Sequence, residues 1–227
     1  MDKLRRNLFP PVCLVCGGDG QPDMDCCVPC EADLPVLPGR CRRCGLELNR
    51  DVDLCGRCAT ARPHFSAAWP AFAYRGVIEG LVQRFKFHGD LAAGRLLGDL
   101  LARRLGHLRA PRPDLLIPVP LHGRRRLQRG YNQAALLCRD VSRHFGTLPW
   151  TEALRRVRST AVQSELPAER RGGNVRGAFE IACLPGLPKR VALLDDVMTT
   201  GATLDECARV LRSAGVEQID VWVVARA

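Results

Sequence analysis

The sequence has few aromatic residues and no long hydrophobic run. Only 5% of its 227 residues are aromatic, so few rings are available to stack on the bases of a nucleic acid. Phe85, Phe87 and Tyr131 fit a protein core equally well. The longest apolar runs, residues 191–194 and 221–225, fall well short of the roughly 20 residues that a membrane helix needs. The sequence therefore predicts no membrane insertion.

Lysine is scarce, because Lys3, Lys86 and Lys189 are the only ones. The net charge of +10 therefore comes almost wholly from arginine. The planar guanidinium suits phosphate groups, so the charge is compatible with phosphorylated substrates or with nucleic acid. A bias in genomic base composition would give the same excess, and the charge alone does not decide between these readings.

The residues before Cys13 do not predict a secretory signal peptide, because they contain no apolar stretch of sufficient length. We therefore expect a cytoplasmic protein, in which thiols stay reduced and closely paired cysteines are metal ligands rather than disulfides. Nine of the 12 cysteines lie before residue 59.

Four C-x-x-C pairs can be formed from these cysteines, and two such pairs complete the tetrahedron that structural Zn²⁺ prefers. Consecutive pairing predicts two closed sites, which leave no open position for catalytic water. Either Cys26 or Cys27 supplies one of the ligands. The predicted Zn²⁺ ligands are Cys13, Cys16, Cys27 and Cys30 in one site, and Cys41, Cys44, Cys55 and Cys58 in the other.

Beyond the cysteines, the pattern of apolar residues alternates between strands and helices. It predicts strands at 65–74, 114–119, 190–196 and 216–225, two helices within 77–108, and helices at 130–145 and 203–213. The arginine-rich stretch 155–176 is expected to be a mobile loop with a short helix. We infer an α/β fold with a mostly parallel, doubly wound sheet over residues 63–227 and a Cys-rich zinc module over residues 1–62.

The most specific motif is the run Val191-Ala192-Leu193-Leu194-Asp195-Asp196-Val197-Met198-Thr199-Thr200-Gly201-Ala202-Thr203. A buried strand delivers two carboxylates where open α/β sheets bind ligands. The turn that follows opens a helix, whose backbone N–H groups can hold a phosphate. The carboxylates suit a sugar phosphate with Mg²⁺. The alternative is a generic turn with an N-cap threonine and solvent-facing aspartates.

This run resembles the signature of type I phosphoribosyltransferases. The resemblance implies that Asp195 and Asp196 contact ribose hydroxyls of 5-phosphoribosyl-1-pyrophosphate, with pyrophosphate and Mg²⁺ nearer the strand that ends at Pro120. The implied 5-phosphate ligands are Thr199, Thr200, Gly201, Ala202 and Thr203, and the implied pyrophosphate end comprises Pro120, Leu121, His122, Arg124 and Arg125.

Arg158, Arg170 and His122 each have two interpretations. Arg158 or Arg170, from the polar stretch 155–176, is expected to close over the site as a lid. The alternative is a solvated loop. His122 fits an ordinary surface histidine equally well.

Taken in order along the chain, the motifs are similar to those of the ComF family. They are the cysteine pairs, Phe85-Lys86-Phe87-His88-Gly89-Asp90, Pro118-Val119-Pro120-Leu121, Arg129-Gly130-Tyr131-Asn132-Gln133, Gln163-Ser164, Arg170, Asn174-Val175-Arg176-Gly177-Ala178-Phe179 and the aspartate run.

The resemblance to this family implies a double zinc ribbon, a phosphoribosyltransferase domain and a role in natural competence and DNA uptake. It leaves the acceptor and turnover open. The alternative function is a non-catalytic adaptor that binds single-stranded DNA or a competence helicase.

Overall fold

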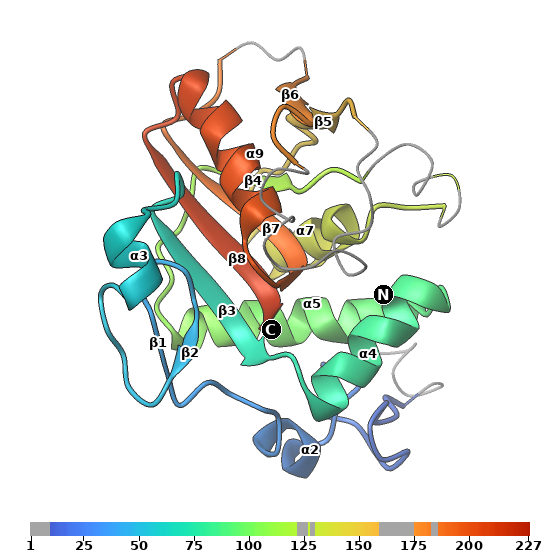
Figure 1. The fold of residues 1–227 in the computed structure, drawn as a ribbon. Helices are drawn as coiled ribbons and strands as arrows, with labels where there is room; N and C mark the ends of the chain where they lie inside the picture. The colour runs from blue at the N-terminus through green and yellow to red at the C-terminus, as the bar shows by residue number, and fades with distance from the viewer. Residues whose placement is uncertain (1–9, 122–126, 128–129, 159–174, 183–185) are drawn as a thin grey trace.

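The protein is built around a four-stranded sheet in the order β3-β8-β7-β4, in which every neighbouring pair is parallel (Figure 1). The computed structural model describes residues 10–121, 127, 130–158, 175–182 and 186–227. The mostly parallel α/β fold predicted from the alternating pattern is confirmed. The strands are β3 (Ala67–Ala73), β4 (Leu115–Pro118), β7 (Arg190–Met198) and β8 (Gln218–Arg226).

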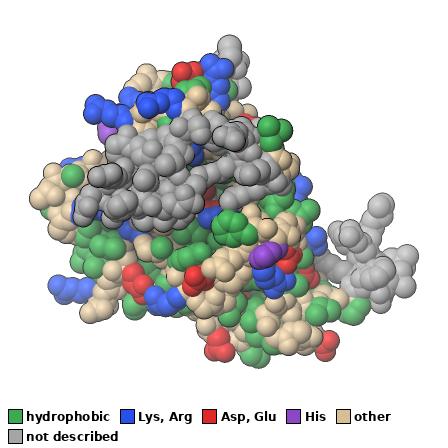
Figure 2. Space-filling view, turned by 45° about the vertical axis from the view of Figure 1, so that its right-hand side comes forward, with side chains coloured by type: hydrophobic (Ala, Val, Ile, Leu, Met, Phe, Trp, Pro, Cys, Tyr) green, Lys and Arg blue, Asp and Glu red, His purple; other side chains and the backbone are tan. Residues whose placement is uncertain are grey.

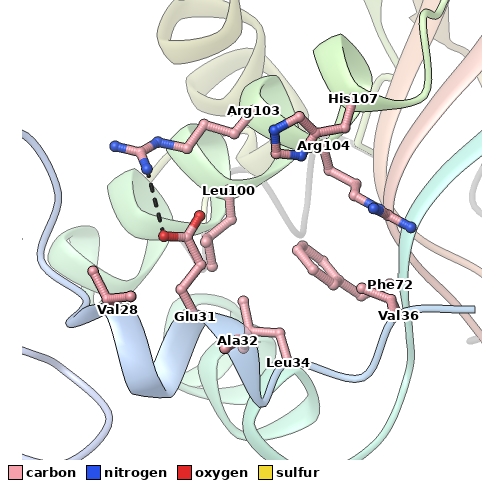
Figure 3. A pocket seen from close by; sticks show the side chains of 10 residues that line it. All are labelled: Val28, Glu31, Ala32, Leu34, Val36, Phe72, Leu100, Arg103, Arg104 and His107. Carbon is pink, nitrogen blue, oxygen red and sulfur yellow. Dashed lines mark hydrogen bonds and ion pairs between the residues drawn. The ribbon is translucent and has the colours of Figure 1, made fainter.

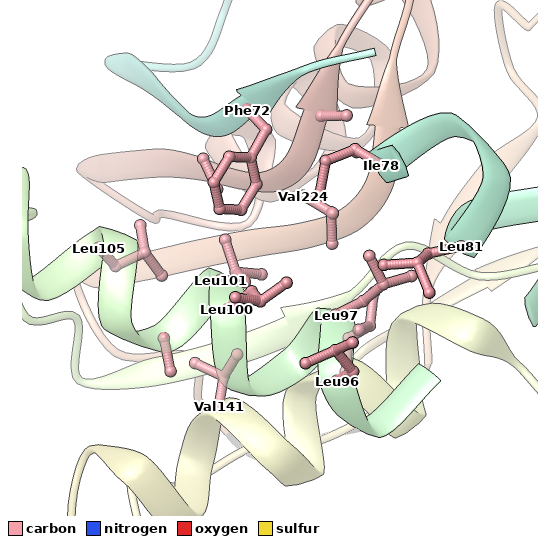
Figure 4. Close-up of a cluster of buried hydrophobic side chains, with 14 of the residues drawn as sticks. Phe72, Ile78, Leu81, Leu96, Leu97, Leu100, Leu101, Leu105, Val141 and Val224 are labelled. Carbon is pink, nitrogen blue, oxygen red and sulfur yellow. The ribbon is translucent and has the colours of Figure 1, made fainter. Parts of the chain in front are cut away.

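Helices cover both faces of this sheet, which explains why the central strands are apolar along their length. One face carries α4 (Gly76–Phe87), α5 (Leu91–His107) and α7 (Gln133–His144), and the other carries α9 (Ala202–Ser213). Figure 4 shows Leu97 and Leu101 of α5 packed among side chains of α4, α7 and β8. This packing holds the carboxyl ends of the strands in fixed positions.

The predicted interruption between the two helices of 77–108 lies where the sequence places it. Gly89 has a φ of 67°, which ends α4, and the Asp90 carboxylate accepts a hydrogen bond from the N–H of Ala93 at 2.9 Å, which caps α5. Arg84 Nη2 lies 2.7 Å from the same carboxylate. The cap hydrogen bond and this arginine lower the pKa of Asp90. The end of α4 is therefore held in a defined orientation.

The cysteine-rich segment forms two small modules that share their cores with the rest of the chain. Met24, Cys26 and Leu34 join the cluster under α5, whereas Cys41 and Cys58 join the cluster on the α9 side. The boundary near residue 62 stays a prediction. The elements of the modules are α2 (Val28–Ala32), the antiparallel pair β1 (Gly39–Arg40) and β2 (Glu47–Leu48), and α3 (Gly56–Thr60).

An antiparallel hairpin of β5 (Leu154–Arg156) and β6 (Phe179–Ile181) lies beside α9 (Figure 1). The predicted loop 155–176 is wrong at its start, because Arg155 and Arg156 belong to β5 and pair with β6. Leu154 and Phe179, at the ends of this pairing, are buried. Residues 159–174 of that predicted loop, including Arg170, lie outside the described residues. Within the described part of the chain, no helix combines the length and apolar character that crossing a membrane requires.

Candidate functional site

The two aspartates lie on β7 itself, near its carboxyl end, because the strand continues to Met198. Leu193 packs in the cluster on the α9 side and Leu194 in the cluster on the α5 side. Side chains alternate between the two faces of a strand, so Asp195 lies on the face covered by α9, and Asp196 lies on the face covered by α5. Asp196 is only 6% exposed. The alternative of solvent-facing aspartates is therefore wrong.

Lys86, at the end of α4, forms an ion pair with Asp196. Its Nζ lies 2.8 Å from Asp196 Oδ1, and both side chains are largely buried. Lys86 belongs to the motif Phe85-Lys86-Phe87-His88-Gly89-Asp90 but was not predicted as a site residue. The signal that pointed to it was its isolation in a chain whose other cations are almost all arginine.

The pKa values of these groups are shifted by burial and by each other. Burial and the neighbouring Asp196 raise the pKa of Asp195 to about 7, although the charges of Lys86 and Arg156 act in the opposite direction. Burial disfavours the charged form of Lys86, but the two aspartates outweigh it and raise the pKa of this lysine. The site therefore exchanges a proton near neutral pH.

Each carboxylate retains one oxygen for a ligand. Asp195 Oδ1 accepts the N–H of Asp196 at 2.9 Å, and Asp196 Oδ1 accepts the N–H of Val197 at 2.6 Å. The second oxygen of each has no hydrogen-bond partner among the described residues. Carboxylate oxygens of this kind are suitable acceptors for hydroxyl groups.

The turn after β7 leads into α9 through a left-handed glycine. Gly201, with a φ of 82°, is the N-cap of α9 and provides no side-chain cap, so the alternative of an N-cap threonine is wrong. A Cβ on Gly201 would lie 2.6 Å from Met198 Cε. The Thr200 hydroxyl accepts the N–H of Ala202 at 3.4 Å. The N–H groups that follow have no acceptor within the helix, so they are available to a ligand.

The end of β4 lies beside the aspartates. Pro118 pairs with Leu194 in the parallel register, and Val119 donates to the Leu194 carbonyl at 2.9 Å. Pro120 and Leu121 therefore follow at the level of the aspartates, as predicted for the pyrophosphate end. His122, Arg124 and Arg125 lie outside the described residues.

Tyr131 and Asn132, from the polar motif, make contacts that hold this corner of the molecule together. Asn132 caps α7 and donates to the Val119 carbonyl at 3.2 Å, and the Tyr131 hydroxyl donates to the Phe85 carbonyl at 2.7 Å. Phe85 is in the core, but Phe87 is 68% exposed, so a core position for Phe87 is wrong. It lies on the outward side of the last turn of α4. The motif thus links the end of β4 to the helix that carries Lys86.

Arg156 and Arg158 lie at the end of β5 or just after it, on the side of the sheet that α9 covers. Arg158 is exposed and donates to the Arg176 carbonyl at 3.1 Å, and its predicted closing role stays a prediction. Arg156, two residues earlier, stacks over the Phe179 ring at 5.4 Å and lies close enough to lower the pKa of Asp195. Arg156 was not predicted as a site residue.

The structure brings the cysteines together in the two predicted sets. Each set has all four sulfur atoms within 4.8 Å of one another, and the sets are Cys13, Cys16, Cys27 and Cys30, and Cys41, Cys44, Cys55 and Cys58.

The spacing within each set fits zinc. A tetrahedral ion with Zn–S bonds of about 2.3 Å separates its sulfurs by about 3.8 Å. The Sγ atoms of Cys16 and Cys27 are 3.8 Å apart, and those of Cys44 and Cys55 are 3.7 Å apart. Cys27 belongs to the first set and Cys26 does not, because Cys26 is fully buried in the core, where burial raises the pKa of its thiol to about 12.

A separate cavity of 480 Å³ lies between α2 and α5 (Figure 3). Leu34, Phe72 and Leu100 form an apolar wall, and the Arg103 guanidinium faces Glu31 across the opening. None of its lining residues belongs to the aspartate site.

The surface carries mixed charge. Figure 2 shows basic and acidic side chains interspersed on one face. Several exposed arginines are paired with carboxylates, such as Arg155 with Glu180 and Arg190 with Asp114. Binding of single-stranded DNA stays a prediction.

Comparison with known proteins identifies relatives of the whole chain. Residues 4–59 match the sequence model of a double zinc ribbon domain. The chain is 38% identical to "Competence protein F" of Haemophilus influenzae, over 88% of this chain and 90% of the relative. It is 35% identical to "DNA utilization protein YhgH" of Salmonella typhi, over 82% and 83% of the two chains. Among solved structures, a purine phosphoribosyltransferase from Pyrococcus horikoshii aligns with a TM-score of 0.35 at 19% identity, over 58% of this chain and 80% of that chain.

Proposed function

The chain belongs to the ComF family of competence proteins, and on this premise we propose that it binds 5-phosphoribosyl-1-pyrophosphate at the carboxyl ends of β7 and β4. The observation that carries the proposal is the arrangement of Asp195, Asp196 and Lys86 directly before a turn whose N-cap is a left-handed glycine. Carboxylates accept the ribose hydroxyls, and the turn holds the 5-phosphate.

Lys86 makes the acidic pair compatible with a phosphorylated ligand. Two adjacent carboxylates would repel a phosphate and each other, and the ammonium group 2.8 Å from Asp196 offsets part of that charge. The lysine also orients Asp196, since it occupies one oxygen and leaves the other for a hydroxyl. Thr200 and Thr203 are half-buried at the turn, where their hydroxyls supplement the backbone donors.

We further propose that the site supports transfer of the phosphoribosyl group to an acceptor. Transfer would break the bond between C1 of the ribose and pyrophosphate, with positive charge growing on the sugar. The residues of this chain contribute by holding the ribose through Asp195 and Asp196 and the phosphate through the turn, so that the acceptor meets a fixed C1. Mg²⁺ bound with the pyrophosphate would neutralise the leaving group.

The two cysteine clusters are proposed to hold Zn²⁺ as structural ions. Four thiolates surround each position and leave no room for a reacting water. We expect two zinc ions per chain by elemental analysis of protein purified without chelator. A cytoplasmic role in natural competence or DNA utilisation is proposed from the names of the relatives.

The experiment that tests ligand binding is calorimetric titration with 5-phosphoribosyl-1-pyrophosphate and Mg²⁺. Replacing both Asp195 and Asp196 with asparagine removes two charge-assisted acceptors, and we expect binding to weaken by about a hundredfold or more. Asp114→Asn is the matched control, because Asp114 lies at the amino end of the same strand pair and forms a salt bridge with Arg190. Absence of binding to the wild-type protein, or equal binding by the double variant, would refute the proposal.

A further inference from the structure

The second cysteine cluster is connected to the phosphate turn through the buried residue Arg226. This arginine ends β8 and is 5% exposed. Its Nη1 donates to the Met198 carbonyl at 3.0 Å, and its Nε donates to the Cys44 carbonyl at 3.4 Å. Met198 immediately precedes the turn, and Cys44 is a predicted metal ligand. One side chain therefore bridges the cluster and the base of the turn.

Arg226 Nη1 also donates to the carbonyl oxygen of Ala227, beside its contact with Met198. Among the described residues, no aspartate or glutamate forms a salt bridge with Arg226. A zinc ion with four thiolates carries a net charge of about −2, which is the counter-charge that a buried guanidinium needs.

Arg57 makes a second, independent connection. It lies between the ligands Cys55 and Cys58 on α3, and its Nη2 donates to the Thr200 carbonyl at 3.3 Å. The position of Arg57 is set by the two ligands that flank it. The cluster thus contacts the turn both at its base, through Met198, and at its centre, through Thr200.

Among the described residues, the first cluster has no such contact with the turn. In the part of the chain that the structure describes, its module is attached to the opposite helical layer. Arg84 of α4 donates to the Leu14 carbonyl at 3.2 Å, and Arg103 of α5 pairs with Asp23 at 2.7 Å. The two clusters have similar ligand geometry, but the first is joined to α4, the helix that carries Lys86, and the second to the turn, so the first is a control for the contact with the turn.

We propose that Arg226 and Arg57 are positioning residues that connect the metal state of the second cysteine cluster to the affinity of the phosphate turn. Metal in this cluster holds both arginines in place, and they fix the carbonyls of Met198 and Thr200, so that the turn presents its N–H groups to the 5-phosphate. This proposal rests on the proposed function for its ligand. By reciprocity, the ligand strengthens retention of that metal ion.

The first test compares Arg57→Gln with Arg42→Gln. Both arginines are exposed and lie beside cluster ligands, but Arg42 faces Asp53 at 3.5 Å and does not contact the turn. We expect Arg57→Gln to weaken binding of 5-phosphoribosyl-1-pyrophosphate about tenfold and Arg42→Gln to leave it unchanged. Arg226→Lys keeps the positive charge but cannot donate to both carbonyls in the same geometry, so it should weaken binding at least as much. Its circular dichroism spectrum and zinc content must first match those of the wild type. Equal affinities in all variants would overturn the proposal.

The second test does not require the ligand. Hydrogen exchange of the amides of residues 198–204 is measured in zinc-loaded protein, and we expect faster exchange in Arg57→Gln and Arg226→Lys than in Arg42→Gln. Unchanged exchange would overturn the inference even if the wild type binds the sugar phosphate. If the wild type does not bind it, the proposed function fails, and exchange alone then decides whether the arginines position the turn.

Zinc release to a chromophoric chelator provides a third readout. In the wild type, 5-phosphoribosyl-1-pyrophosphate should slow the release of one of the two ions, and Arg57→Gln should remove that protection. Equal slowing of both ions, or of neither, would contradict the coupling.

Discussion

Lys86 Nζ lies 2.8 Å from Asp196 Oδ1 and thereby joins the last turn of α4 to the carboxyl end of β7. The pair is largely buried, and the loss of one partner would leave the other charge without compensation. It also places a positive charge near Asp195, whose pKa it lowers. The ionisation of the whole site near neutral pH therefore depends on this lysine.

Lys86→Gln should move the pH dependence of ligand binding upward. Without the ammonium group, the two aspartates repel each other more strongly, so the pKa of Asp195 rises above about 7. We expect the pH midpoint for binding of 5-phosphoribosyl-1-pyrophosphate to increase by about one unit, measured by titration between pH 6 and 9. Lys189→Gln is the control, because Lys189 is exposed and pairs with Glu217 far from the aspartates. The same shift in both variants would contradict this role.

Ionisation of Asp195 should lower the stability of the ligand-free protein as the pH rises. Its folded pKa of about 7 exceeds the unfolded value of about 3.9, so the folded state holds the proton more tightly. The free energy of unfolding should therefore decrease from pH 4 to pH 7 through this group. Asp195→Asn should be roughly 4 kcal/mol more stable than the wild type at pH 8, with the difference vanishing near pH 4. Denaturant unfolding at both pH values measures it, and a difference independent of pH would refute the assignment.

Gly201→Ala and Gly215→Ala should separate backbone strain from ligand binding. Both glycines have positive φ, at 82° and 90°, and lie at the two ends of α9. Alanine in this conformation costs about 1–2 kcal/mol, so both variants should lose stability in thermal unfolding, and Gly201→Ala should lose more because only its Cβ meets a close contact. Only Gly201→Ala should weaken binding, by about tenfold or more, because its Cβ would press on Met198 at the base of the turn. Equal affinities would show that the turn does not hold the phosphate.

Gln133→Leu should stabilise the ligand-free protein. The Gln133 side chain is 2% exposed, and among the described residues neither its Nε2 nor its Oε1 has a hydrogen-bond partner. A buried amide in this state costs about 1–3 kcal/mol, and leucine has a similar volume. We expect an increase in the free energy of unfolding of about 1 kcal/mol, measured with denaturant. Gln83→Leu, which changes an exposed glutamine on α4, should have little effect, and a destabilised Gln133→Leu protein would show that the amide is satisfied in solution.

The sequence by itself determined the features that depend on local spacing. Two residues between cysteines set the grouping of the thiols, alternating apolar runs set the parallel sheet, and the run from Val191 to Thr203 placed two carboxylates before a turn. Each of these follows from the geometry of a short segment, so it can be inferred without knowledge of the rest of the chain.

Only the tertiary structure decided which distant residues meet. It chose Cys27 over Cys26, because the backbone turns the Cys26 side chain into the core. It also placed Lys86 on Asp196, and Arg226 between Cys44 and Met198. These contacts join segments far apart in the chain, and they arise from the packing of helices and modules on the sheet. No local pattern encodes that packing, which is why the residues around the aspartates could not be predicted from the sequence alone.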